Sequence, residues 1–342
     1  MNTASISPSS ADAPVLSFTI AGTDAGKRLD AFLTEQVEGW SRSRLQRLIE
    51  DGDVLVNEKP AKASYKLHEN DEIDVDLVEV QADVFEPENI PLDIVFEDEF
   101  LAVINKPAGM VVHPGAGINS GTLANAIAYH FSVGVDPAIE REIEEEPEDG
   151  VAAIVLNKNQ RVGIVHRLDK DTSGLIVVAK NQEIHEALSE QFRDRTVQKK
   201  YVALVHGSLR ENFGTIDRPM ARDRWHRTKM TVAANGRQAI TLWKVRTRFE
   251  KFTLVDVEIK TGRTHQIRVH LASLNHPVVG DETYNEGRDN TINDTNIRNG
   301  IRSMNRFFLH SANLSFTHPQ TEERLAFTSE LPEELAQLLK LL

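Results

Sequence analysis

The sequence predicts an α+β protein with a small N-terminal domain and a larger domain of mixed helices and strands. The chain has 342 residues, of which 40% are hydrophobic, which is enough for two or three cores. Residues 79–91 are acidic, contain two prolines and suit a linker. Beyond them, β-branched runs alternate with amphipathic helical patterns. The expected strands are Phe100–Asn105, Lys199–His206 and Phe252–Ile259, and the expected helices are Leu123–Phe131, Glu183–Arg193, Thr264–Leu274 and Pro332–Leu342.

Charge is distributed unevenly along the chain, whose formal net charge is −13. Residues 136–150 alone carry eight acidic residues and one arginine, a net −7, and removing them from −13 leaves −6 for the rest. Residues 40–66 instead hold six basic residues against four acidic ones. Basic surfaces therefore remain available to an anionic partner despite the acidic total.

Cysteine is absent, which excludes disulfides, a thiolate nucleophile and cysteine-ligated zinc, and fits a reducing cytoplasm. The first residues, MNTASISPSSADAP, lack the basic start and apolar core of a secretory signal, and no eighteen apolar residues run together. We therefore expect a cytoplasmic protein that does not enter a membrane, with residues 1–16 as a disordered tail.

Residues 17–78 are expected to form the first domain. Apolar residues at helical spacing from Leu29 to Val37 predict one helix, and a second follows Ser41, with Arg44 and Arg47 on one face. Short strands follow, including the alternating run from Glu72 to Leu77. This arrangement, with its segment DGDVLVNEKP, resembles the S4 RNA-binding domain. The resemblance makes Arg44 and Arg47 candidate RNA contacts; the alternative is that they form the solvated face of an amphipathic helix.

The segment GIVHRLDKDTSGLIVVAK, residues 163–180, holds Asp169 on a polar loop between two apolar runs that predict buried strands. Strands that fix both ends of a loop make a rigid mount for a reactive side chain, so Asp169 is our candidate nucleophile. The segment resembles motif two of the pseudouridine synthases, HRLDxxTSG, whose catalytic aspartate corresponds to Asp169.

A nucleophilic carboxylate needs a cationic partner, and arginine suits it because it stays charged. The segment TGRTHQIRVH offers Arg263 at the expected start of a helix capped by Thr264. The resemblance gives Arg263 the role of pairing with Asp169. It also makes Tyr201, in QKKYVALVHG, an active-site residue that stacks on the base and is a candidate to assist proton removal from C5.

Two further residues are candidate RNA contacts. Arg167 lies two residues before Asp169, so in an extended segment it points to the same side. The resemblance implies that Arg167 stabilises a nucleotide flipped out of its helix. Lys106, in the family-like segment NKPAGMVVHPG, is a candidate contact to RNA phosphate.

Other site chemistries fit less well. Asp169 opens a pattern similar to a calcium loop, but its twelfth position is Lys180 instead of glutamate. His265 and His270 are five apart, not four, which disfavours zinc. Asp169 and Asp171, two apart on one turn, give little support to a glycosidase pair; Asp171 and its neighbours are expected to hold the turn through bonds from side chain to backbone.

The resemblance covers about four-fifths of the chain and is closest to subfamily D of the large-subunit ribosomal RNA synthases. It implies a domain over 92–342 built on a mixed, largely antiparallel sheet with flanking helices, interrupted by an acidic insert near 132–160. It implies isomerisation of uridine to pseudouridine in large-subunit ribosomal RNA by a monomer, with no cofactor or metal. Transfer RNA as substrate, a hydrolytic N-glycosidase and a noncatalytic RNA-binding assembly factor remain alternatives.

Overall fold

The computed structural model divides into two compact units, an N-terminal unit ending at residue 77 and a C-terminal unit beginning at residue 86. The described residues are 5–8, 14–37, 40, 42–77, 86–113, 118, 120–131, 163–223, 225–226 and 228–342. The acidic insert expected near 132–160 therefore lies outside the described residues.

The N-terminal unit is a five-stranded antiparallel sheet with the strand order β1-β2-β5-β3-β4, joined by two helices. Its elements are β1 (Ser5–Pro8), β2 (Pro14–Thr19), α1 (Leu29–Gln36), α2 (Arg42–Asp51), β3 (Val54–Val56), β4 (Lys59–Pro60) and β5 (Glu72–Asp76). Both expected helices are present because the residues at helical spacing, Leu29, Leu33, Leu45 and Leu48 among them, are fully buried.

The expected disordered tail over residues 1–16 is contradicted where the structure describes that segment, because residues 5–8 and 14–16 lie in strands. Strands β1 and β2 pair with each other, with Ser5 opposite Ser17 and Pro8 opposite Pro14. Strand β1 is too short to show a pattern of its own, and its pairing with β2 is what defines it. The side chains of Arg44 and Arg47 on α2 lie outside the described part of the structure, so their contacts stay a prediction.

A buried carboxylate joins the two helices of this unit. Asp30, whose side chain is fully buried, accepts hydrogen bonds from Arg28 at 2.9 Å, Arg42 at 3.0 Å and Gln46 at 2.7 Å. The bond from Arg28, with those from Gln46 and Arg42, holds the pKa of Asp30 well below its usual range. These bonds fix α2 against α1.

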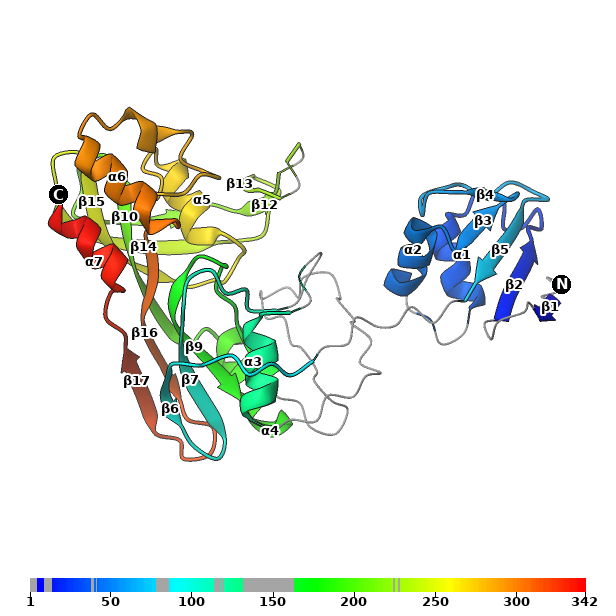
Figure 1. Ribbon diagram of the computed structural model, residues 1–342, viewed down its shortest axis with the longest axis horizontal. Coiled ribbons are helices and arrows are strands. Elements are labelled where there is room, and N and C mark those ends of the chain that lie inside the picture. Colours follow the sequence, from blue (N-terminus) through cyan, green and yellow to red (C-terminus); the bar gives the residue numbers. More distant parts are fainter. Residues whose placement is uncertain are drawn as a thin grey trace. The chain divides into compact units, whose positions relative to one another are not determined.

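The C-terminal unit is built on a ten-stranded sheet in which β9 and β16 form the one parallel pair among the described strands (Figure 1). The main strand order is β11-β14-β15-β10-β16-β9-β7-β6, with β17 beside β16 and β8 beside β9. The strands are β6 (Ile94–Glu97), β7 (Leu101–Lys106), β8 (Gly163–Ile164), β9 (Ser173–Ala179), β10 (Gln198–His206), β11 (Phe213–Asp217), β14 (Ile240–Arg248), β15 (Phe252–Ile259), β16 (Leu309–Thr317) and β17 (Arg324–Thr328). A separate hairpin consists of β12 (Met220–Arg222) and β13 (Met230–Val232).

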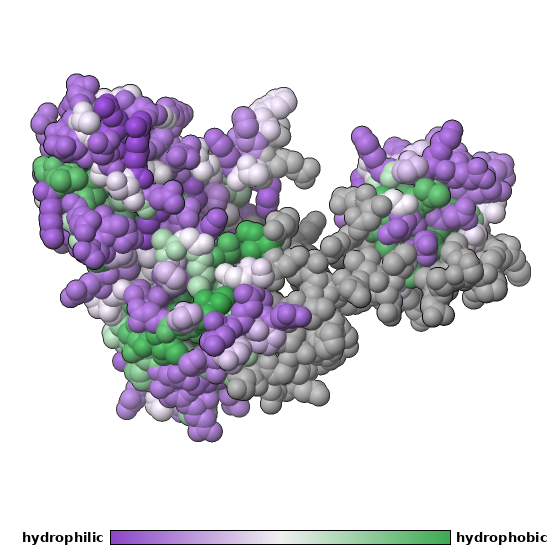
Figure 2. Space-filling model, in the orientation of Figure 1, coloured by the Kyte–Doolittle hydropathy of each residue, from purple (hydrophilic) through white to green (hydrophobic). Residues whose placement is uncertain are grey.

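Helices flank this sheet: α3 and α4 lie beside its β6 to β9 part, and α5 to α7 beside its β10 to β15 part (Figure 1). They are α3 (Leu123–His130), α4 (Gln182–Arg193), α5 (Gln266–Ser273), α6 (Thr295–Met304) and α7 (Glu333–Lys340), with a 3₁₀ turn at Arg288–Thr291. Much of the visible surface is hydrophilic, with several smaller apolar patches (Figure 2). The predicted α+β class with a mixed, largely antiparallel sheet is confirmed.

The packed part of the C-terminal unit begins earlier than the predicted boundary at residue 92. The backbone carbonyl of Glu86 accepts a hydrogen bond from Asn125 at 2.8 Å, and the Glu88 carboxylate accepts one from the amide of Gly121. Residues 86–91 therefore pack against the start of α3 and are not free linker.

Deleting residues 1–80 should leave the C-terminal unit folded, because each unit has a hydrophobic core of its own. We expect the fragment 81–342 to unfold in a single cooperative transition in urea and to bind RNA more weakly than the full chain. Circular dichroism and a filter-binding titration would measure the two effects. A fragment that melts without cooperativity would contradict this division.

Candidate active site

The loop that carries Asp169 is held rigidly at both ends. It follows β8 and leads into β9, whose residues are all buried. Inside the loop the amide of Thr172 donates to the carbonyl of Asp169 at 3.0 Å. At its end Gly174 has φ of +109°, and a Cβ there would lie 2.3 Å from the carbonyl oxygen of Ser311. Only glycine permits this close approach of β9 to β16, which places the Asp169 loop beside β16.

Lys106 supports this loop from beneath and does not reach RNA. Its side chain is fully buried, and its ammonium donates to the carbonyls of Pro107, Met110 and Lys170 at 2.8 to 3.1 Å. Burial lowers the pKa of Lys106 to about 7. The predicted contact of Lys106 with RNA phosphate is therefore wrong, because its donors are used inside the protein. The bonds that hold the turn in the described residues are those from Lys106 to the carbonyl of Lys170 and from the amide of Thr172 to the carbonyl of Asp169, and the expected bonds from the Asp171 side chain are not among them.

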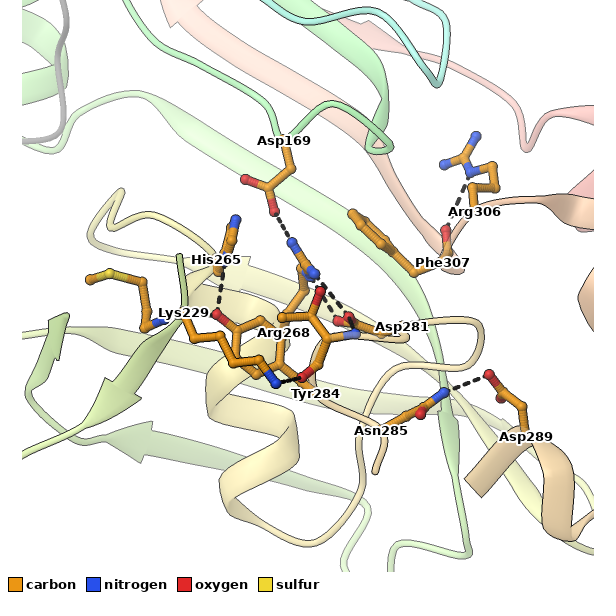
Figure 3. Close-up of polar contacts among 12 residues, drawn as sticks. Asp169, Lys229, His265, Arg268, Asp281, Tyr284, Asn285, Asp289, Arg306 and Phe307 are labelled. Atoms are coloured by element: carbon orange, nitrogen blue, oxygen red, sulfur yellow. Dashed lines mark hydrogen bonds and ion pairs between the residues drawn. The ribbon is translucent and has the colours of Figure 1, made fainter. Parts of the chain in front are cut away.

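Asp169 pairs with Arg268, which α5 presents from the other side of the site (Figure 3). The Nη1 atom of Arg268 lies 3.1 Å from the Oδ2 of Asp169. The same guanidinium makes two further bonds, of 2.7 and 2.8 Å, to the carboxylate of Asp281. The Arg268 side chain is only 6% exposed and that of Asp281 1%, whereas Asp169 is 18% exposed. The Asp281 end of this network of ion pairs is therefore buried, and the Asp169 end is accessible.

Two aromatic rings lie against the Arg268 guanidinium and help to fix its position. Its central carbon lies 4.3 Å from the centroid of the Phe307 ring and 5.0 Å from that of Tyr284. The Tyr284 hydroxyl is 2.8 Å from Nδ1 of His265. Burial lowers the pKa of Arg268, but the bonds to Asp281 and Asp169 outweigh it, and the net shift is upward. Arg268 therefore stays charged beside Asp169.

The expectation that Arg263 pairs with Asp169 is wrong for the described structure. Arg263 lines the same pocket, and its Nε donates to the carbonyl of Gln238 at 3.3 Å. The expected helix start is wrong as well, since α5 begins at Gln266 and Thr264 does not cap it. The side-chain oxygen of Gln266 accepts from the amide of Arg263 at 3.1 Å and from the Thr261 hydroxyl at 2.7 Å. This bonding keeps residues 261–265 out of the helix and gives the inward-facing position to Arg268.

Tyr201 lies on β10 in the same pocket as Asp169. It is 5% exposed, and burial, followed by the negative charge of Asp169, raises the pKa of its hydroxyl above the usual value. The phenol therefore stays neutral. A neutral ring of this kind suits stacking against a base better than proton removal.

The pocket around Asp169 is strongly cationic. Among the described residues that line it, Asp169 is the one carboxylate, and seven are lysine or arginine: Arg167, Arg193, Arg195, Lys199, Lys260, Arg263 and Arg268. In a chain of net charge −13, this concentration of positive charge around one carboxylate points to a polyanionic substrate. Arg167 is exposed and lines the pocket with Asp169, on the side that the two-residue spacing predicted.

Five of the seven pocket cations were missed by the sequence analysis. Arg193 ends α4 and Arg195 lies just beyond it. Lys199 lies at the start of β10, where burial lowers its pKa to about 8, and Lys260 follows β15. Arg268 was missed too, although a sequence signal existed. It stands between Ile267 and Val269 in an apolar stretch, and a charged residue buried in such a stretch requires a partner.

His265 and His270 have different surroundings. His270 is fully buried, with Nδ1 2.9 Å from the Thr241 hydroxyl and Nε2 3.0 Å from the carbonyl of Arg218, so it is structural. His265 lines the pocket. Within the described ranges, no three acidic, histidine or cysteine side chains gather as metal ligands would. No helix in those ranges is both long and apolar enough to cross a membrane.

Comparison with known proteins gives a consistent answer. A family model described as RNA pseudouridylate synthase matches residues 100–273, and one described as S4 domain matches residues 27–73. The uncharacterized RNA pseudouridine synthase YlyB of Bacillus subtilis is 39% identical over 95% of this chain and 97% of its own. The ribosomal large subunit pseudouridine synthase D of Nitrosomonas europaea is 41% identical, over 95% of this chain and 87% of its own.

Among solved structures, the human RNA pseudouridylate synthase domain containing 4 aligns with a TM-score of 0.53, covering 72% of this chain and 91% of that one at 24% identity. That likeness supports the fold. The family resemblances found in the sequence are thus confirmed. The chain belongs to the RNA pseudouridylate synthase family, and it is an RNA isomerase with an S4 domain at its N-terminus.

Proposed function

We propose that this enzyme converts specific uridines of large-subunit ribosomal RNA to pseudouridine, with Asp169 as the nucleophile. The observation that carries the proposal is the pocket described above, in which one accessible carboxylate, fixed by a buried arginine, stands among cations. Relatives named ribosomal large subunit pseudouridine synthase D support the choice of RNA.

The reaction breaks the bond between N1 of uracil and C1′ of ribose and forms a bond between C5 and C1′. The proton on C5 passes to solvent and N1 gains one, so atoms and charge balance without an oxidant or a group donor. Asp169 attacks either C1′ or the uracil ring, and both routes need the carboxylate ionised and fixed. Arg268 supplies a permanent positive charge 3.1 Å from Oδ2, which keeps the Asp169 carboxylate ionised and holds it in position.

The target uridine must leave its helix to reach Asp169, since base chemistry of this kind is blocked inside a stacked duplex. Tyr201 stacks on the uracil in this proposal, which its neutral ring in the lining of the same pocket supports. Arg167, exposed beside Asp169, is suited to hold the flipped nucleotide or its phosphate.

Tritium release from C5-labelled uridine tests the proposal. The enzyme with labelled large-subunit ribosomal RNA should release tritium into water and leave pseudouridine in the RNA, with no free uracil. Free uracil would instead identify an N-glycosidase. Release from transfer RNA alone would identify transfer RNA as the substrate. No release from either RNA would favour a protein that binds RNA without modifying it.

Salt should weaken RNA binding far more than it slows chemistry on saturated enzyme. If the pocket cations contact roughly two to four phosphates, raising salt from 50 to 200 mM should raise Kd by about 10- to 150-fold. Arg195→Gln should flatten the salt dependence, whereas Arg246→Gln, which removes an arginine paired with Asp256 outside the pocket, should not. A Kd that stays level over this range would contradict the role of the cations.

A further inference from the structure

Trp225 stands out from the C-terminal unit in an unusual position. It lies between β12 and β13 and is 88% exposed, more than any other large hydrophobic residue in the described part of the chain. The hairpin that carries it projects from the body of the unit (Figure 1). A tryptophan ring gains more free energy from burial than most side chains, so a ligand that covers this ring would gain affinity from it.

Hydrogen bonds hold the backbone at Trp225. The carboxylate of Asp223 accepts from the amides of Trp225 at 2.8 Å and His226 at 2.7 Å. Across the turn, the amide of Asp223 donates to the carbonyl of Lys229 at 2.9 Å. The backbone amides of Trp225 and His226 are thus tied to Asp223, so binding through Trp225 needs less ordering of these residues.

Positive charge surrounds this ring in the sequence. Residues 222–229, RDRWHRTK, contain four arginine or lysine residues and one aspartate, in a chain whose net charge is −13. On the face seen in Figure 2, the coloured part of the hairpin is hydrophilic to neutral. An aromatic ring interleaved with cations is the combination that stacks on a nucleic-acid base while its neighbours contact phosphates.

The base of the hairpin is attached to the active site. The amide of Met230 donates to the Tyr284 hydroxyl at 2.9 Å, and the ammonium of Lys229 donates to the carbonyl of Thr283 at 2.8 Å. Tyr284 in turn contacts His265 and lies against Arg268, the partner of Asp169 (Figure 3). RNA held at the hairpin is thus held on an element that is anchored to the residues around Asp169.

We propose that Trp225 is an RNA-binding residue that stacks on an unpaired base of the substrate, outside the pocket that takes the target uridine. The inference rests on the proposed function, because the ligand is the same RNA. Its effect is on affinity and on the choice of site, since Trp225 itself does not line the pocket.

The test compares three variants of the full chain in binding and turnover on transcribed large-subunit ribosomal RNA. Trp225→Ala should raise Kd and KM by about 5- to 150-fold, the usual range for losing one base stack, while kcat changes less than about twofold. Trp225→Phe keeps an aromatic face and should recover most of the affinity. Phe213→Ala removes another exposed ring, 74% exposed on β11, and should bind as the unmodified enzyme does.

Tryptophan fluorescence separates stacking from a structural role. RNA should quench the emission of the unmodified enzyme, and most of that quenching should disappear in Trp225→Phe. A Kd for Trp225→Ala within twofold of that for Phe213→Ala would overturn the proposal, as would equal losses in the Ala and Phe variants. If the unmodified enzyme binds this RNA but makes no pseudouridine, the proposed function fails, and the binding series still decides the role of Trp225. Absence of any binding to this RNA would overturn both.

Discussion

Asp169→Asn should abolish pseudouridine formation, with a loss of at least about 10⁴-fold in kcat. The amide has the shape of the carboxylate, so its oxygen can still accept the bond from Nη1 of Arg268 that is 3.1 Å long in the structure. It lacks the negative charge, however, and cannot act as the nucleophile. Tritium release from C5-labelled RNA, with chromatography of the digested RNA for pseudouridine, measures the loss.

Binding should survive this change, because the seven cations of the pocket remain and one nearby negative charge is gone. We expect the Kd of Asp169→Asn for RNA to equal or fall below that of the unmodified enzyme. Asp256→Asn is the matched control, since it removes a carboxylate paired with Arg246 outside the pocket, and it should keep full activity. Comparable tritium release from the two variants would mean that another group is the nucleophile.

The local parts of this site could be predicted from the sequence. Asp169 was recognisable because it lies on a short polar loop between two β-branched runs, and such runs predict strands that hold the loop rigidly. The structure has β8 and β9 on either side of this loop. The strand that carries Tyr201 and the helix α4 were likewise within reach, because each depends on its own pattern of buried residues.

The parts that depend on contacts distant in sequence could not be predicted. Arg268 meets Asp169 across 99 residues of chain, and which of two arginines in TGRTHQIRVH faces inward is decided by the hydrogen bonds of Gln266. Lys106 was a candidate contact to RNA phosphate because it lies in a family-like segment, whereas here three backbone carbonyls bind its ammonium inside the protein. A lysine at the end of a buried strand, such as Lys106 on β7, should therefore be considered first as a donor to backbone carbonyls inside the protein.

Arg268→Gln should damage both activity and stability, and the two losses can be separated. The change removes the partner of Asp169 and leaves the carboxylate of Asp281, 1% exposed, without its two charged bonds. Breaking a buried pair in this way typically costs about 3–5 kcal/mol in the free energy of unfolding. We expect a loss of that size in urea titrations, and a fall in kcat of at least about 10²-fold from the misplaced nucleophile.

A second substitution isolates the catalytic part of this effect. Adding Asp281→Asn to Arg268→Gln removes the buried unpaired charge, so the double variant should regain at least about 2 kcal/mol of stability. Its kcat should stay low, because Asp169 still lacks the arginine that pairs with it. Arg263→Gln is the control within the same pocket, and its free energy of unfolding should change by less than about 0.5 kcal/mol. If Arg263→Gln abolished turnover while the stabilised double variant kept it, the functional partner of Asp169 would be Arg263; the opposite result would assign that role to Arg268, as the 3.1 Å ion pair predicts.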